Sequence, residues 1–194
     1  MFRIVALSVL ASSSLASVGC STLAKQVYYG VRGASGKFYE LNIVDPLRLA
    51  TFRAVQFAPF ENALGERVPA EVVAAVDEHV PEVLADSHLF FPDGKPLRIE
   101  GRIVHYTGKS GLIGALSSFL GGQECVSRVR LVDADTGELI GEAMCWGSVK
   151  SAVRQGPEEF GKGVGKGIAK WIEDRLPEDV VEQRREMNSD QSEQ

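Results

Sequence analysis

Residues 97–106 alternate between apolar and charged side chains, and this alternation limits the fold more than any other feature of the chain. The segment reads LRIEGRIVHY. Successive side chains of a β-strand point to opposite faces of a sheet, so the odd and even positions must meet different surroundings. The expected core face carries Leu97, Ile99, Ile103 and His105. The expected outer face carries Arg98, Glu100 and Arg102. We therefore predict a sheet with one buried face and one charged face.

Two apolar stripes with helical spacing accompany this strand. The first follows Pro69 and repeats every fourth residue, which is typical of a helix. Its members are Val72, Val76 and Val80. We expect Pro81 to end or kink this helix, because a proline ring clashes with the preceding turn. The second stripe follows Pro157 and predicts a closing helix. Its members are Phe160, Val164, Ile168, Trp171, Ile172 and Leu176.

Further strands complete the pattern. Residues 53–60 (RAVQFAPF) predict one strand, and residues 125–149 predict a hairpin that turns at DADTG, residues 133–137. The order is therefore strand, helix, strand, strand, strand, helix. Helices on one face of a mainly antiparallel sheet satisfy this order most simply. We expect an α+β fold, a two-layer sandwich.

The predicted domain organisation has four parts. They are a removed signal peptide (1–19), a lipid-anchored tether with a possible edge strand (20–50), one α+β domain (51–178) and a polar, disordered tail (179–194). The chain has 194 residues, 44% of them hydrophobic and 24% charged, which suits one ordinary globular domain. Its net charge of −5 gives no reason to expect a nucleic-acid partner.

Small residues occur on both the last strand and the last helix. On the strand they are Gly141, Ala143 and Gly147. On the helix they are Gly161, Gly163, Gly165 and Gly167. A glycine inside a helix costs ~1 kcal/mol relative to alanine. We expect the helix to lie unusually close to the sheet.

Together these segments resemble a family of bacterial lipoproteins known as domain of unknown function 4410. The resemblance covers residues 53–176 and rests on LRIEGRIVHY, the glycine-rich connection of residues 108–123, VRLVDADTGELIGE and the closing helix. It implies an envelope location and a module similar to those of periplasmic assembly and secretion lipoproteins. It implies no activity, since the family has none established.

The N-terminus points to the same compartment. MFRIVALSVLASSSLASVGC has a basic residue, an apolar run and small residues before Cys20, as a secretory signal peptide does. A cysteine directly after the cut resembles the bacterial lipoprotein signal, although Ser17 stands where that signal prefers leucine. The resemblance implies cleavage before Cys20 and acylation of its thiol with palmitate-type chains. Ser21, in place of aspartate, implies the outer membrane. A plain secreted protein is the nearest alternative.

Cys125 and Cys145 lie on the two expected strands of the hairpin. A register that places Arg128 opposite Glu142 also places these cysteines opposite each other, and a disulfide is then possible. An oxidising periplasm would favour it. The alternative is two buried free thiols, because a one-residue bulge at the turn would separate them.

The sequence contains no recognisable catalytic constellation. His79, His88 and His105 lack zinc-type spacing, and neither a phosphate-binding loop nor a Gly-x-Ser-x-Gly elbow is present. His105 is the best candidate base, but a histidine on the core face of a strand is usually structural. We predict no catalytic residues, no metal and no cofactor.

The expected outer face has the composition of a binding surface. Arginine and aromatic side chains are enriched at interfaces. The candidate partner-binding residues are Arg98, Arg102, Arg128, Arg130 and Trp146. By alternation Val104, Tyr106 and Met144 lie beside them. Alternatively, residues 37–52 cover the apolar half, while Glu100 and Glu142 neutralise the arginines.

The favoured function is a non-catalytic binding or assembly module, attached by acyl chains to the outer membrane and facing the periplasm. Its expected partner is an envelope protein or glycan. One alternative is an oligomeric secretion or channel component in which residues 108–122 enter the membrane. A second is a periplasmic hydrolase built around His105.

Overall fold

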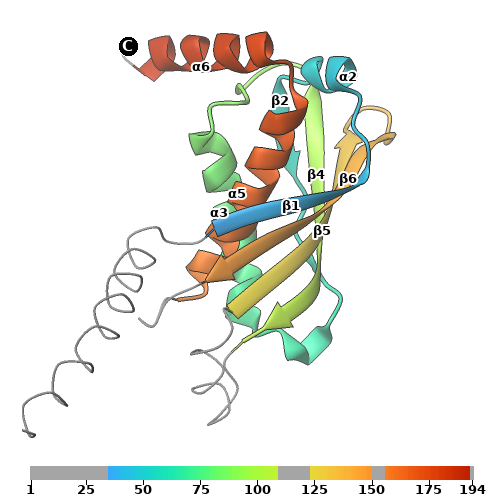
Figure 1. The fold of residues 1–194 in the computed structure, drawn as a ribbon, viewed down its shortest axis with the longest axis vertical. Coiled ribbons are helices and arrows are strands. Elements are labelled where there is room, and N and C mark those ends of the chain that lie inside the picture. Colours follow the sequence, from blue (N-terminus) through green and yellow to red (C-terminus); the bar gives the residue numbers. More distant parts are fainter. Residues whose placement is uncertain (1–34, 109–122, 150–155, 193–194) are drawn as a thin grey trace, which may run out of the picture.

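The computed structural model of the protein describes residues 35–108, 123–149 and 156–192 (Figure 1). The predicted signal peptide, Cys20, the tether up to residue 34 and most of the glycine-rich connection lie outside the described residues. The predictions made for them therefore stay predictions.

Six strands form one sheet, in the order β1-β6-β5-β4-β2, with β3 also beside β4. Their bounds are β1 Ser35–Asn42, β2 Ala54–Phe57, β3 Glu61–Asn62, β4 Pro96–Thr107, β5 Gln123–Asp133 and β6 Leu139–Val149. The β1–β6, β6–β5 and β5–β4 pairs are antiparallel, whereas β2 and β3 run parallel to β4. Parallel neighbours need a long crossover. The helix between β2 and β4 supplies it.

The helices are α2 Pro46–Ala50, the short 3-10 helix η1 Gly65–Arg67, α3 Ala70–Asp86, α5 Glu158–Arg175 and α6 Glu178–Ser192. The two long helices α3 and α5 lie side by side on one face of the sheet (Figure 1). The core fills the space between these layers, and its largest side chains include Trp171, Ile168 and Ile99, each 0% exposed. The predicted two-layer α+β sandwich is confirmed.

Helix α3 does not end at Pro81, which was one of the two outcomes expected there, the other being a kink. The helix continues through this proline to Asp86. An interior proline costs ~3 kcal/mol. Val80 and Leu84, on either side of it, are 0% and 1% exposed. Each such burial contributes ~1.5–3 kcal/mol, so packing outweighs the local penalty.

Helix α5 lies against the sheet as closely as the glycines predicted. A Cβ built on Gly163 would lie 2.6 Å from the Cα of Gly147, and a Cβ on Gly147 would lie 2.5 Å from the Phe160 carbonyl oxygen. These neighbours are backbone atoms and cannot move aside as a side chain can. Only glycine at both positions permits this approach.

Strand β1 is an edge strand, as the sequence suggested, and it belongs to the domain. It pairs with β6 along its whole length, apart from a bulge between Glu40 and Asn42. Val44 and Leu49, which follow it, are both 1% exposed in the core. The folded unit therefore begins by Ser35, ahead of the boundary expected at residue 51.

The expectation of a disordered tail is wrong for the part of it that the structure describes, where α6 forms. Its sequence has little apolar periodicity, but Arg184 is only 3% exposed. The guanidinium donates hydrogen bonds to three backbone carbonyls, those of Ala50 (2.9 Å), Phe52 (2.7 Å) and Leu89 (2.8 Å). Arg184 therefore helps to fasten α6 to the domain, together with Asn188, whose amide donates to the His88 carbonyl at 2.8 Å, and Val181, which is 8% exposed in the core.

Candidate functional site

The candidate site is the surface of the sheet that faces away from α3 and α5, which we call the open face. Within the described residues no helix lies over it (Figure 1). Residues 37–52 do not cover it either, because β1 extends the sheet sideways beside β6. The open face carries Lys37, Tyr39, Arg98, Glu100, Arg102, Arg128, Arg130, Glu142, Met144 and Trp146.

All four arginines of the predicted site lie on the open face, and each has a carboxylate nearby. Arg98 Nε lies 2.9 Å from Glu100 Oε1, and Arg130 Nη1 lies 3.1 Å from Glu100 Oε2. Arg102 Nε lies 3.7 Å from Glu61 Oε2. Because Arg98 and Arg130 share one glutamate, the arginines outnumber their carboxylates.

The strongest pair joins Arg128 and Glu142. Arg128 Nε and Nη2 donate to the two oxygens of Glu142 at 2.8 and 2.9 Å. The hydrogen bonds that Arg128 donates to Glu142 raise the pKa of Arg128. The expected register placed these residues opposite each other, but Arg128 lies opposite Met144 and Arg130 opposite Glu142. The ion pair therefore forms on the diagonal.

Arg102 and Arg128 are direct cross-strand neighbours on β4 and β5. Like charges placed opposite each other destabilise a sheet. Here each arginine has its own carboxylate, Glu61 and Glu142, on the side away from the other. The two guanidinium groups therefore lie on neighbouring strands of the open face with no carboxylate directly between their positions in the ladder.

An apolar part adjoins the charged part. Trp146 is half-buried and lies between Lys37 of β1 and Val126 of β5 in the ladder. Met144, two residues before it, lies between Tyr39 and Arg128. An aromatic ring beside arginines on an open surface is the composition that marks protein interfaces.

A β-bulge at Val104 changes the faces predicted for the end of β4. Ile103 pairs with Ser127 and His105 with Val126, so Val104 is the extra residue. After the bulge His105 is exposed on the open face. Tyr106 turns inward, where its ring packs edge-on against Phe160 at 5.5 Å between centroids. The placements of His105 in the core and Tyr106 on the outer face were therefore wrong.

A second irregularity separates the cysteines. The β5–β6 register shifts between Leu131 and Val132, next to the turn, and Cys125 lies opposite Gly147 instead of Cys145. Diagonal neighbours on a sheet lie ~7–8 Å apart, too far for a disulfide. Both are free, buried thiols. The disulfide prediction is wrong, and the bulge considered as its alternative is the reason.

Burial makes these thiols poor nucleophiles. It raises the pKa of Cys125 to about 12, although a contact with Ser127 works in the other direction. It also raises the pKa of Cys145. The reactive form of a cysteine is the thiolate, so neither group is suited to catalysis or to metal binding at neutral pH.

Within the described parts of the chain, the structure gathers one group of potential metal ligands that sequence spacing missed. Glu78, His79 and Glu82 of α3 bring three ligand atoms within 4.8 Å of one another. His79 Nδ1 lies 2.5 Å from a Glu82 oxygen, so the histidine already has a partner. The signal in the sequence was a glutamate three residues after a histidine on a helix. Nothing else in the structure points to an ion there.

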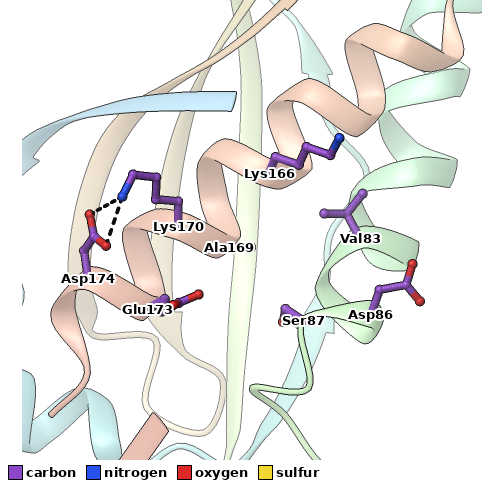
Figure 2. A pocket seen from close by; sticks show the side chains of 8 residues that line it. All are labelled: Val83, Asp86, Ser87, Lys166, Ala169, Lys170, Glu173 and Asp174. Atoms are coloured by element: carbon purple, nitrogen blue, oxygen red, sulfur yellow. Dashed lines mark hydrogen bonds and ion pairs between the residues drawn. The ribbon is translucent and has the colours of Figure 1, made fainter. Parts of the chain in front are cut away.

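The helix side carries a shallow pocket of about 390 Å³ between α3 and α5 (Figure 2). Its floor is apolar, formed by Val83 and Ala169. Its rim carries charges of both signs, with Lys170 bonded to Asp174 at 2.9 and 3.1 Å. The pocket is far from the predicted site, since it lies on the opposite side of the helix layer from the sheet.

No protein-family model and no curated protein matches the chain. A solved PelC dodecamer from Paraburkholderia phytofirmans gives a TM-score of 0.47 at 12% identity, over 69% of this chain and 95% of that one. A variant of the same protein gives 0.48 at 13%, with the same coverage. A PDZ domain protein from Parabacteroides distasonis gives 0.37 at 11%, over 80% of this chain and 40% of that one. These likenesses do not say what the chain binds, and the family resemblance of residues 53–176 stays a prediction.

Among the described helices, none has the length and apolar character needed to cross a membrane.

Proposed function

We propose that the protein is a non-catalytic binding or assembly module of the bacterial envelope, anchored through acyl chains on Cys20 to the outer membrane and facing the periplasm. Its partner is an envelope protein or glycan that presents carboxylate groups to the open face.

One observation carries the proposal: two arginines of the open face, Arg102 and Arg128, lie directly opposite each other, and a half-buried tryptophan lies on the same face. Arg98 and Arg130 share Glu100, and Arg102 stands opposite Arg128. A carboxylate from a partner would relieve the repulsion between Arg102 and Arg128 and could bind arginine in a bidentate manner. Trp146 would supply the apolar contact next to it.

The chemistry of the other candidate groups supports a non-catalytic role. His105, the best candidate base, is exposed at the end of β4, and the two described cysteines are buried as thiols. A hydrolase needs a nucleophile within hydrogen-bond reach of its base. The structure gives His105 no such partner among the hydrogen bonds of the described residues.

The test removes two cations of the open face, a change that should have little effect on the stability of the fold. Arg102 and Arg130 are changed together to serine in the full acylated chain. Arg102 and Arg130 have 59% and 47% exposed side chains, and exposed ion pairs contribute ~0–1 kcal/mol each. After crosslinking in the envelope, we expect the crosslinked partner to be lost and thermal unfolding to shift little.

The matched control changes Lys170 and Arg185 to serine. These cations are equally exposed, at 58% and 50%, and equally ion-paired, but they lie on the helix side. The control variant should keep the partner. Loss of the partner in both variants, or in neither, would contradict a role for the open face.

A further inference from the structure

The exposed large hydrophobic side chains of the described residues all fall within residues 39–47. They are Tyr39 (66% exposed), Leu41 (45%), Ile43 (88%) and Leu47 (76%). We call these four side chains the apolar ridge. Scattered exposed apolar residues are ordinary, but a contiguous group marks a contact with another molecule or with a membrane.

The ridge is held in place by the core. Val44 follows Ile43 and Leu49 lies two residues after Leu47; both are 1% exposed, so they fix the segment to the domain. Asp45 caps α2 by accepting hydrogen bonds from the Leu47 and Arg48 amides at 3.0 and 3.3 Å. The segment is therefore held at these points, while Ile43 and Leu47 remain exposed.

The ridge lies close in sequence to the predicted anchor. Ser35, where β1 begins, is fifteen positions after Cys20, so the tether spans at most ~50 Å. We propose that the apolar ridge inserts into the interface of the same bilayer that holds the acyl chains of Cys20. This inference rests on the proposed function. A tether of this length keeps the ridge at a high effective concentration near the lipid, so weak insertion is sufficient.

A second copy of this chain fits the ridge less well. Stable protein interfaces bury ~800 Å² on each partner and involve ~20–30 residues a side, far more than four side chains supply. The free edge of β1 is also poorly suited to pairing, since it carries a bulge between Glu40 and Asn42 and the exposed charge of Lys37. Bulges and lysines are the features by which edge strands avoid pairing with other chains.

The charges beside the ridge indicate which force drives insertion. Asp45 is exposed, and Arg48 is already ion-paired with Glu138. The ridge therefore lacks the basic cluster that recognises anionic lipids. Its aliphatic side chains bury in the lipid. Tyr39 suits the lipid–water interface, because its ring is apolar and its hydroxyl group can contact water. Insertion should be insensitive to salt and should occur with zwitterionic lipid.

The experiment measures the depth of labelled positions in the full acylated chain, reconstituted in phosphatidylcholine–phosphatidylethanolamine vesicles that contain nitroxide lipid. A fluorophore is attached to Leu47→Cys or, as the matched control, to Glu66→Cys. Glu66 is exposed in η1, in the teal segment at the end of the molecule opposite α2 (Figure 1). Cys125 and Cys145 are 0% exposed and should not compete for the label.

We expect quenching at position 47 to be several-fold stronger than at position 66, to be unchanged by salt, and to fall when Ile43→Ser is added. Equal quenching at the two positions would overturn the inference. Energy transfer between labels at position 47 without quenching by lipid would also overturn it, in favour of a second copy. Failure of the chain to incorporate fatty acid in cells would instead contradict the proposed function, and metabolic labelling measures this separately.

Discussion

Arg175 Nη2 lies 2.8 Å from Glu40 Oε2, and this ion pair ties the edge strand β1 to the last turn of α5. The indole N–H of Trp171 and the amide of Val44 donate to the same carboxylate, at 3.1 and 3.2 Å. The side chain of Glu40 is only 11% exposed. The contact therefore fixes the beginning of the domain, and with it the position of the apolar ridge.

The carboxylate of Glu40 should make the free energy of unfolding depend on pH in the acidic range. Burial raises the pKa of Glu40, but the hydrogen bonds from Arg175, Trp171 and Val44 outweigh it and leave the pKa lowered from its ordinary value of 4.5. The stabilisation is complete above that value and is lost as the pH falls through the lower folded-state pKa. Glu40→Gln should lower the free energy of unfolding at pH 7 by ~1–2 kcal/mol and flatten its decline in acid.

Urea unfolding between neutral pH and about pH 3 measures this effect. The control is Glu173→Gln, which breaks the exposed pair with Arg185 and should cost under ~1 kcal/mol. If both variants lose stability in parallel with the wild type as the pH falls, Glu40 is not the group responsible.

Because α5 lies so close to the sheet, we expect a glycine-to-alanine substitution in this helix to destabilise the protein, although the same substitution usually stabilises a helix. In an exposed helix, glycine to alanine stabilises by ~1 kcal/mol. Gly163→Ala should instead destabilise by ~1–3 kcal/mol, because its Cβ would meet the Cα of Gly147 at 2.6 Å. Thermal unfolding of this single variant measures the sign, and a stabilised protein would show that the helix lies farther away.

Arg184 should decide whether α6 stays attached. Arg184→Met removes the donors of three carbonyl oxygens, and each buried group left unpaired costs ~1–3 kcal/mol. We expect rapid amide hydrogen exchange throughout α6, with slower exchange kept in α5. Arg184→Lys should restore little of the protection of α6 from exchange, since an ammonium group cannot reproduce the planar set of donors of a guanidinium.

The neighbouring residue provides the control for this prediction. Arg185 has a 50% exposed side chain, and its guanidinium forms an ion pair with Glu173 of α5 at 3.0 Å. Arg185→Met should leave exchange in α6 almost unchanged. Equal exchange in the two variants would mean that the carbonyl contacts of Arg184 do not hold the helix.

The buried thiols predict a loss of stability in alkali. Burial raises the pKa of Cys125 to about 12 from 9.0, so the unfolded chain releases its proton first as the pH rises. The stability linked to this group is present below about pH 9 and declines above it. Cys125→Ala should reduce that decline, as denaturant unfolding at pH 8 to 10 would show.

Mass spectrometry after alkylation of the unfolded, non-reduced chain should find both Cys125 and Cys145 modified. If neither cysteine is modified, the two form a disulfide after all.

The sequence predicted the layers of this fold but not its local irregularities. Alternation in β4 and the stripe of α5 identify the buried faces, because burial imposes these periods directly. The bulge at Val104 and the register shift next to the β5–β6 turn leave no comparable signal. The bulge in β4 reverses the faces beyond it, and His105 and Tyr106 were misplaced for this reason. The shift between β5 and β6 leaves both cysteines on the core face but changes the residues that lie opposite them.

For the same reason, only part of the candidate site was predicted from the sequence. Arg98, Arg102, Arg128 and Arg130 lie before or between the irregularities, and alternation placed them correctly on one face. Their carboxylate partners depend on the register, so the diagonal pairing of Arg128 with Glu142 could not be read from opposite positions. The attachment of α6 rests in part on the contacts of Arg184 with three distant carbonyls, and no periodic pattern encodes such contacts.

We infer that an acylated Cys20 holds this sandwich of helices and sheet at the outer membrane. Metabolic labelling with an alkyne fatty acid, followed by membrane fractionation, measures this attachment. We expect label in the mature protein, recovered with the outer membrane, and neither label nor membrane recovery for Cys20→Ser. An unlabelled wild-type protein found in the soluble fraction would contradict it.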